Sequence, residues 1–212
     1  MSESRYLPGR HLRGRYIALE GAEGCGKSTH ASRLAAALGA VLTRETGGTA
    51  IGRQIRSILH DTTISNLSDR AEALLAAADR AQHIEEVVAP ALAAGKHVVS
   101  DRSVYSTLAY QGYGRGLPVA EVREFNEWAV NGLWPELVLL IDAAPEVLER
   151  RMRGRQLDRF EREGDKFHER VRDGFRQMTV DEPELWVVID GSQSLEAVAN
   201  DIRATVRDRL DI

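Results

Sequence analysis

The sequence predicts an α/β fold: a three-layer αβα arrangement in which helices surround a central, mainly five-stranded parallel sheet. Short runs rich in β-branched residues alternate with longer stretches of helical periodicity, the order typical of βαβ units. One run, Leu137–Asp142, is nearly all apolar, as expected for a strand buried on both faces of a parallel sheet. The 212 residues are enough for one such domain and too few for two comfortable ones.

Five runs are expected to form the strands: residues 16–20, 41–44, 97–101, 137–142 and 186–190. Three of these runs end in an aspartate, at Asp101, Asp142 and Asp190. Open α/β sheets bind their ligands at the carboxyl edge of the strands, so we expect these acidic side chains near the functional site.

The helices follow from apolar periodicity and from their stop signals. A helix is expected from about Lys27 to Gly39, with apolar residues on one face. The Ala-rich segment 69–94 is helical in pattern, but Pro90 should kink or divide it because proline lacks the N–H that a helix interior needs. A last helix is expected from about Ser194.

The bulk composition is that of a soluble globular protein and argues against several classes. A net charge of −4 gives no electrostatic reason to expect nucleic-acid binding, and no apolar run is long enough to cross a bilayer. The single cysteine excludes an intramolecular disulfide. Residues 1–15 are polar and basic without the apolar stretch of a secretory signal. We expect an N-terminal extension followed by a single domain over residues 16–212, in the cytoplasm.

The segment from Gly21 to Ser28 matches the phosphate-binding pattern G-x-x-x-x-G-K-[ST]. The glycines let successive backbone N–H groups face a phosphate, and the start of the following helix adds partial positive charge. Lys27 is expected to reach the β- and γ-phosphates and Ser28 to ligate Mg²⁺. The expected ATP-binding residues are Gly21, Ala22, Glu23, Gly24, Cys25, Gly26, Lys27, Ser28 and Thr29. This P-loop alone leaves kinases, GTPases and ATPases open.

Further motifs follow the P-loop in a fixed order: residues 43–49 (TRETGGT), 101–103 (DRS), 109–112 (AYQG) and 157–161 (LDRFE). With Glu23 inside the P-loop, these motifs closely resemble those of bacterial thymidylate kinases, from about Tyr16 to the C-terminus. The resemblance implies a P-loop kinase that transfers the γ-phosphoryl group of Mg-ATP to dTMP. It also implies a homodimer packed through helices and an Arg-rich lid at about residues 150–165.

The resemblance assigns roles to individual residues. Asp101 would help to organise Mg²⁺, and Arg102 would hold the acceptor phosphate, a task that suits the bidentate guanidinium group. Glu23 would contact the 3′-hydroxyl of the acceptor. The remaining acceptor-site residues would be Glu45, Arg56, Arg80, Thr107, Tyr110 and Gln111, of which Arg80 and Thr107 meet the thymine edge and Tyr110 crowds the sugar C2′.

The transition-state arginine is expected in the lid. Thymidylate kinases carry this residue either in the P-loop or in the lid, and here the P-loop has Ala22 and Glu23 at those positions. We assign it to Arg153, with Arg151 and Arg155 as the next candidates.

Two positions depart from the family pattern. Thr46 stands where the family usually has proline, and Ala76 stands where it usually has an aromatic ring that stacks on the base, four residues before Arg80. Either another ring fills this gap, with Tyr105 and Tyr113 as candidates, or the acceptor is not dTMP.

Three alternatives therefore accompany the dTMP kinase. The nearest is a kinase of another nucleoside monophosphate or of a nucleoside. A catalytically inactive nucleotide-binding regulator is disfavoured because Lys27, Ser28, Asp101 and Arg102 are all present. A GTPase ranks below both, since the sequence has no Asn-Lys-x-Asp motif for reading guanine.

Overall fold

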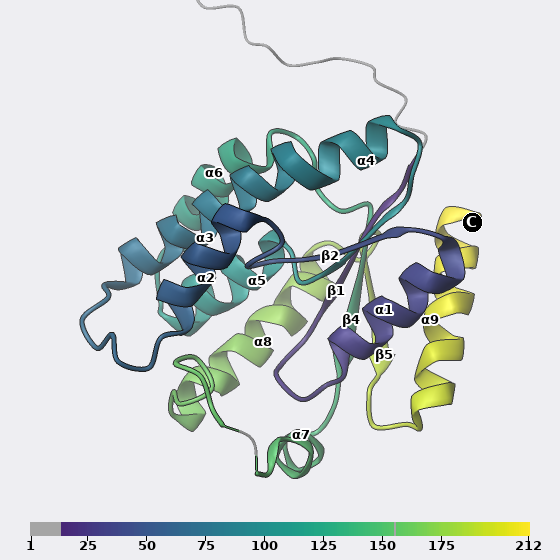
Figure 1. Ribbon diagram of the computed structural model, residues 1–212. Helices are drawn as coiled ribbons and strands as arrows, with labels where there is room; N and C mark the ends of the chain where they lie inside the picture. Colours follow the sequence, from purple (N-terminus) through teal and green to yellow (C-terminus); the bar gives the residue numbers. More distant parts are fainter. Residues whose placement is uncertain (1–13, 155) are drawn as a thin grey trace, which may run out of the picture.

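The computed structural model describes residues 14–154 and 156–212. Its core is a five-stranded sheet with all pairings parallel and the order β2-β3-β1-β4-β5 (Figure 1). The strands are β1 (Tyr16–Glu20), β2 (Val41–Arg44), β3 (Val98–Asp101), β4 (Leu137–Asp142) and β5 (Trp186–Asp190). The five expected strands are confirmed, with β3 starting one residue later than expected.

Helices cover both faces of this sheet. On one face lie α1 (Lys27–Leu38) and α9 (Leu195–Leu210), and on the other lie most of the remaining helices (Figure 1). Side chains of β1 alternate between the two cores: Ile17 and Leu19 pack with α1 and α9, whereas Ala18 packs with the opposite layer. This period-two alternation places an apolar side chain on each face, which is why the strand reads as a continuous apolar run.

The second layer and the connections contain the other helical elements. These are α2 (Ala50–His60), α3 (Asp69–His83), the π-helix η1 (Ile84–Val88), α4 (Ala89–Ala93), α5 (Val104–Thr107), the π-helix η2 (Leu108–Gly114), α6 (Val119–Val130), α7 (Pro145–Met152) and α8 (Asp165–Asp181). The sequence patterns had not singled out α2, α6 or α8.

The Ala-rich segment is interrupted, but by the π-helix η1 (Ile84–Val88) ahead of Pro90 and not at Pro90 itself. Helix α3 passes through η1 into α4, and Ala89 N–H donates to the carbonyl of Ile84, five residues back. Pro90 then takes an early position in α4, where a missing N–H costs little. The other expected helix limits hold. Gly39 ends α1 at φ 61°, and the Ser194 hydroxyl caps α9 by accepting from Ala197 N–H at 3.2 Å.

Strand register brings three loop starts together at one edge. Asp101 at the end of β3 is aligned with Leu19 of β1 and with Arg44 of β2. The P-loop after β1, the Asp101-Arg102 pair and the turn after Arg44 therefore emerge side by side. In the described part of the chain, no helix is both long and apolar enough to span a bilayer.

Candidate active site

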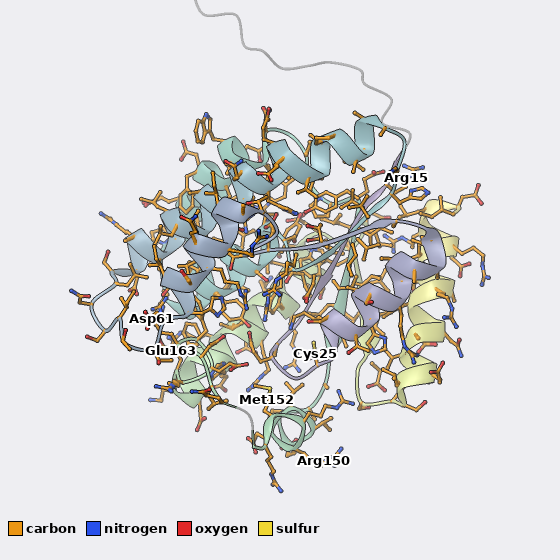
Figure 2. The ribbon with its side chains drawn as sticks, in the orientation of Figure 1. Arg15, Cys25, Asp61, Arg150, Met152 and Glu163 are labelled. Carbon is orange, nitrogen blue, oxygen red and sulfur yellow. The ribbon has the colours of Figure 1, made fainter. Side chains whose placement is uncertain are left out.

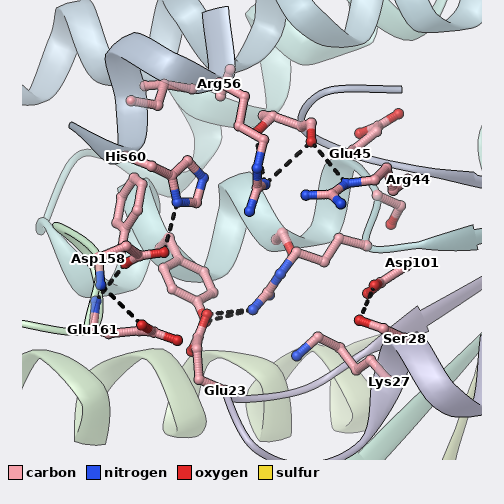
Figure 3. A pocket seen from close by; sticks show the side chains of 18 of the residues that line it. Glu23, Lys27, Ser28, Arg44, Glu45, Arg56, His60, Asp101, Asp158 and Glu161 are labelled. Carbon is pink, nitrogen blue, oxygen red and sulfur yellow. Dashed lines mark hydrogen bonds and ion pairs between the residues drawn. The ribbon is translucent and has the colours of Figure 1, made fainter. Parts of the chain in front are cut away.

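A cavity of about 550 Å³ opens at this carboxyl edge of the sheet. It is lined by the P-loop, the β2–α2 turn, helices α2, α3, α5 and η2, the end of α7 and the segment that follows it (Figure 3). The expected site residues in its lining are Glu23, Gly24, Gly26, Lys27, Ser28, Thr29, Glu45, Arg56, Arg80, Asp101, Arg102, Thr107, Tyr110, Gln111 and Arg151. Gly21, Ala22 and Cys25 belong to the same loop but do not line the cavity.

The P-loop backbone takes a shape that needs glycine. Gly21, Gly24 and Gly26 have φ values of 139°, 79° and 100°, in a region that side chains disfavour. A Cβ at Gly21 would lie 2.5 Å from the carbonyl oxygen of Ile141, and one at Gly24 would lie 3.0 Å from Met152 Cγ. Helix α7, which carries Met152, thus packs directly against the loop that contains Cys25 (Figure 2).

Lys27 and Ser28 start α1 and face the cavity. Lys27 Nζ donates to the carbonyl of Ala22 at 2.8 Å, so the ammonium group lies across the mouth of the loop. The Ser28 hydroxyl donates to Asp101 Oδ2 at 2.5 Å (Figure 3). This hydroxyl and carboxylate are oxygen ligands of the kind that Mg²⁺ prefers, and Mg²⁺ in kinases usually takes its remaining ligands from phosphates and water. The residues present therefore fit a magnesium site.

Arg102, Glu23 and Tyr110 form a compact triangle beside the P-loop. Arg102 donates to Glu23 Oε1 at 2.5 Å and to the Tyr110 hydroxyl at 3.2 Å, and that hydroxyl donates to Glu23 Oε2 at 2.5 Å. Burial raises the pKa of Glu23, but the positive charges of Arg102 and Lys27 outweigh burial and hold that pKa below its ordinary value. Glu23 is therefore an ionised acceptor at neutral pH, beside a guanidinium group.

Arg44 and Arg56 join Arg102 in a cluster of three arginines in the cavity lining. Burial, together with the charges of Arg44 and Arg102, lowers the pKa of Arg56 to about 10. Arg56 also donates to the carbonyl of Thr46 at 3.2 Å, next to the cis peptide bond between Glu45 and Thr46. Three like charges this close are a ready site for an anion such as a phosphate. Arg44 was missed as a site residue, although it lies inside the 43–49 motif.

Arg80 is buried behind this cluster, with 2% of its surface exposed. It donates to Glu45 at 2.8 Å, to the Ser103 carbonyl at 3.2 Å and to the Thr107 hydroxyl at 3.0 Å, and also bonds Asn126. Burial raises the pKa of Glu45, but Arg80 and a hydrogen bond from His83 hold it below its usual value. The guanidinium is thus fixed at the inner end of the cavity, where Thr107 and Gln111 also lie.

The two rings proposed to fill the gap at Ala76 do not line the cavity, although Ala76 itself does. Tyr105 is buried against Trp186, with ring centroids 4.9 Å apart, and its hydroxyl donates to Glu182. Tyr113 lies over Gly174 of α8. The expectation for both was wrong.

Phe160, from the 157–161 motif, is a ring that does line the cavity, and the sequence left its role unassigned. It stands edge-on to His60, with centroids 5.3 Å apart, and to Tyr110 at 5.9 Å. His60 in turn contacts Asp158 Oδ2 at 2.7 Å (Figure 3). His60 and Asp158 also line the cavity and were likewise not anticipated.

The expected lid arginines separate in the structure. Arg151 lines the cavity and donates to the carbonyls of Cys25 at 3.5 Å and Gly191 at 2.9 Å. Arg153 is exposed just beyond the end of α7 and does not line the cavity. Arg155 lies outside the described residues.

A parallel sheet with a P-loop after its central strand, a Ser28–Asp101 pair and an arginine cluster across one cavity defines a P-loop nucleoside monophosphate kinase. The thymidylate kinase family model matches residues 19–202. A thymidylate kinase of Geotalea uraniireducens is 44% identical over 209 residues, covering 93% of this chain and 98% of the relative. That of Chromobacterium violaceum is 46% identical over 197 residues, covering 90% of this chain and 92% of the relative.

A solved structure agrees with these sequence matches. The crystal structure of thymidylate kinase from Ehrlichia chaffeensis has a TM-score of 0.76 at 28% identity, covering 92% of this chain and 98% of that one. The chain belongs to the thymidylate kinase family. It is accordingly an ATP-dependent phosphotransferase whose reaction is the phosphorylation of dTMP.

Proposed function

We propose that the chain binds Mg-ATP and dTMP at opposite ends of the one cavity and transfers the γ-phosphoryl group in line between them. The observation that carries this proposal is the position of the arginine cluster, Arg44, Arg56 and Arg102, which shares the cavity with Lys27 of the P-loop. Transfer between two bound phosphates requires two anion sites in one cavity.

In the proposed reaction, an oxygen of the dTMP phosphate attacks the γ-phosphorus. The bond from that phosphorus to the bridging oxygen breaks, and ADP and dTDP result. Lys27 holds the β- and γ-phosphates, while the arginine cluster orients the attacking phosphate. Ser28 and Asp101 would hold the Mg²⁺, which neutralises phosphate charge when bound. Because the attacking oxygen is already anionic, no general base is needed.

Glu23, Arg80, Thr107 and Gln111 are proposed to read the acceptor nucleoside. Glu23 is ionised and held by Arg102 and Tyr110, which suits it to accept from the sugar 3′-hydroxyl. Arg80 offers only donors and suits a pyrimidine carbonyl. Glu45, buried behind it, serves to hold Arg80 in place.

The segment of about residues 150–165 is proposed to act as the lid, and Arg151 to supply the transition-state charge. Arg151 is favoured over Arg153 because it already lines the cavity next to the P-loop. Closure of the lid would exclude water and so limit wasteful ATP hydrolysis.

The decisive experiment measures ADP release with ATP and Mg²⁺ across a panel of nucleoside monophosphates and nucleosides. Preferred turnover of dTMP is expected. Preferred turnover of another acceptor would overturn the assignment of substrate. Absence of turnover despite ATP binding would favour a catalytically inactive nucleotide-binding regulator.

A kinase with a broader acceptor range is the second candidate, and Ala76 is the observation in its favour. Its small side chain lines the acceptor end, where a larger one would narrow the space. Ala76→Phe is expected to lower KM for dTMP if the added ring stacks on the base. An unchanged or increased KM would indicate a pocket shaped for a different acceptor.

A homodimer is also proposed, formed through α3 and α6. These helices pack side by side and expose two large apolar side chains, Leu74 at 58% and Trp128 at 84%. Exposed apolar side chains of this kind are typically buried when a homodimer interface forms. Trp128→Ser should shift the sedimenting species toward monomer, and a dimer of unchanged stability would rule out this face.

A further inference from the structure

A buried carboxylate behind the acceptor end of the cavity, that of Glu72 on α3, has no exposed surface and accepts hydrogen bonds from two other segments. Gln111 Nε2 of η2 donates to Glu72 at 2.8 Å, and Arg115, the residue after η2, donates to it at 3.0–3.1 Å. From the segment after α7 comes Arg159, at 2.5 Å. Glu72 thus joins the acceptor pocket to that segment.

The carboxylate of Glu72 is ionised. Burial raises its pKa, but hydrogen bonds from Arg115, Gln111 and Arg159 outweigh burial and hold that pKa below its ordinary value. An ionised carboxylate only accepts hydrogen bonds, so it dictates which end of a neighbouring amide faces it.

Gln111 must therefore turn its NH₂ group toward Glu72, as observed. Its carbonyl oxygen, Oε1, is left on the other side of the amide. Gln111 lines the cavity, and among the residues that the structure describes no hydrogen-bond donor is seen on this oxygen. The pocket thus has at Gln111 a fixed acceptor available for a ligand, in the same lining as the donor-only side chain of Arg80.

A keto pyrimidine matches this pair, because its ring N3 carries a proton and its O4 is an acceptor. Cytosine presents the opposite pattern at both positions: a bare N3 and an amino group. With a cytosine base, N3 and Gln111 Oε1 would be two acceptors facing one another, and the amino group and Arg80 would be two donors facing one another. Both mismatches cost binding free energy.

We propose that Glu72 is a specificity-determining positioning residue: it fixes the Gln111 amide with Oε1 toward the acceptor base, so that the pocket selects a base with a protonated N3 over one without. This inference deepens the proposed function and rests on it. Glu72 does not touch the substrate and acts through Gln111.

The test compares kcat/KM for dTMP and dCMP in the wild type, Glu72→Gln, the double variant Glu72→Gln with Gln111→Glu, and Glu163→Gln. Glutamine at position 72 can donate as well as accept, which frees the Gln111 amide to turn over. The dTMP-to-dCMP ratio should fall by about tenfold or more. In the double variant the carboxylate introduced by Gln111→Glu is a fixed acceptor again, so the ratio should recover toward that of the wild type.

Glu163→Gln is the matched control, since it removes the other strong partner of Arg115, at 2.6 Å, and leaves Glu72 intact. Its ratio should stay at the wild-type value. Both substrates are measured on one preparation, so a reduced folded fraction cancels from the ratio.

An unchanged ratio in Glu72→Gln would overturn the inference alone, provided that the wild type prefers dTMP. An equal fall in Glu163→Gln would also overturn it, because the effect would then come from general loosening of the ion-pair network. A wild type with no preference for dTMP over dCMP would overturn both the inference and the proposed substrate.

Discussion

The two ends of the cavity are built on different principles. The phosphate end at the P-loop comes from one contiguous stretch, in which three glycines with positive φ turn backbone groups toward the ligand. The acceptor end comes from side chains of α2, α3, η2 and the segment after α7, which meet only in the folded chain. A backbone cradle depends on local conformation, whereas the acceptor end depends on distant packing and on buried ion pairs.

This difference predicts how the two ends respond to substitution. At the P-loop residues that face the ATP phosphates, Lys27 and Ser28, a change should act on the chemical step and leave acceptor selection intact. At the acceptor end, a change should act first on KM and on discrimination, because the buried carboxylates Glu45 and Glu72 hold the groups that read the base.

The largest effect is expected at Lys27. Lys27→Met removes the ammonium group that faces the phosphates, and kcat should fall by roughly 10²–10³-fold, the loss typical when one charge-stabilising donor is removed. The ADP-release assay at saturating dTMP measures it. Lys96→Met, a lysine outside the cavity, is the control and should retain wild-type kcat. A similar loss in both variants would contradict the assignment.

The next effect separates the arginines of the proposed lid. Arg151→Ala should lower kcat by about 10²-fold or more, whereas Arg153→Ala should change it less than about tenfold, since transition-state arginines in P-loop enzymes have large effects. Arg155→Ala completes the set. Single-turnover rates provide the measurement. If Arg153→Ala shows the dominant loss of rate, Arg153 supplies the transition-state charge. Three small losses would mean that no arginine of the lid supplies it.

A smaller effect is expected at Phe160. Phe160→Leu keeps an apolar side chain but removes the ring, so KM for dTMP should rise about tenfold with little change in kcat, as for lost stacking on a base. Phe125→Leu, a partly buried ring outside the cavity, is the matched control. If both variants bind dTMP as the wild type does, Phe160 is only a packing residue.

The smallest effect concerns the contact between Asp158 and His60. Burial opposes ionisation of Asp158, but the hydrogen bond from His60 and backbone donors hold its pKa at about 2. An aspartate in the unfolded chain has a pKa of about 3.9, so the contact should stabilise the fold above that pH and lose its effect as the pH falls toward 2. Wild type should unfold about 2–4 °C above Asp158→Asn near pH 6. The difference in unfolding temperature should disappear in acid. A difference independent of pH would show that ionisation of Asp158 is not its cause.

The sheet and the P-loop could be predicted from the sequence because their signals are local. Each strand is a short apolar run, and Gly21 to Ser28 carries its own conformation. Phe160, His60 and Glu72 gave no such signal, since their roles depend on which elements pack together. The lid arginines show the same limit. Arg151 lies in the last turn of α7 and reaches the Cys25 carbonyl of the P-loop, whereas Arg153 follows the end of the helix and lies outside the cavity lining. The residue at which α7 ends cannot be predicted from an arginine-rich run.

Ala76 also has a consequence for ligand design. The methyl side chain of Ala76 at the acceptor end leaves space that a larger side chain would fill. A thymidine analogue with an added group directed at this space would bind the wild type and clash with Ala76→Phe. The same substitution thus serves as a resistant control, with which inhibition through this pocket is distinguished from inhibition elsewhere.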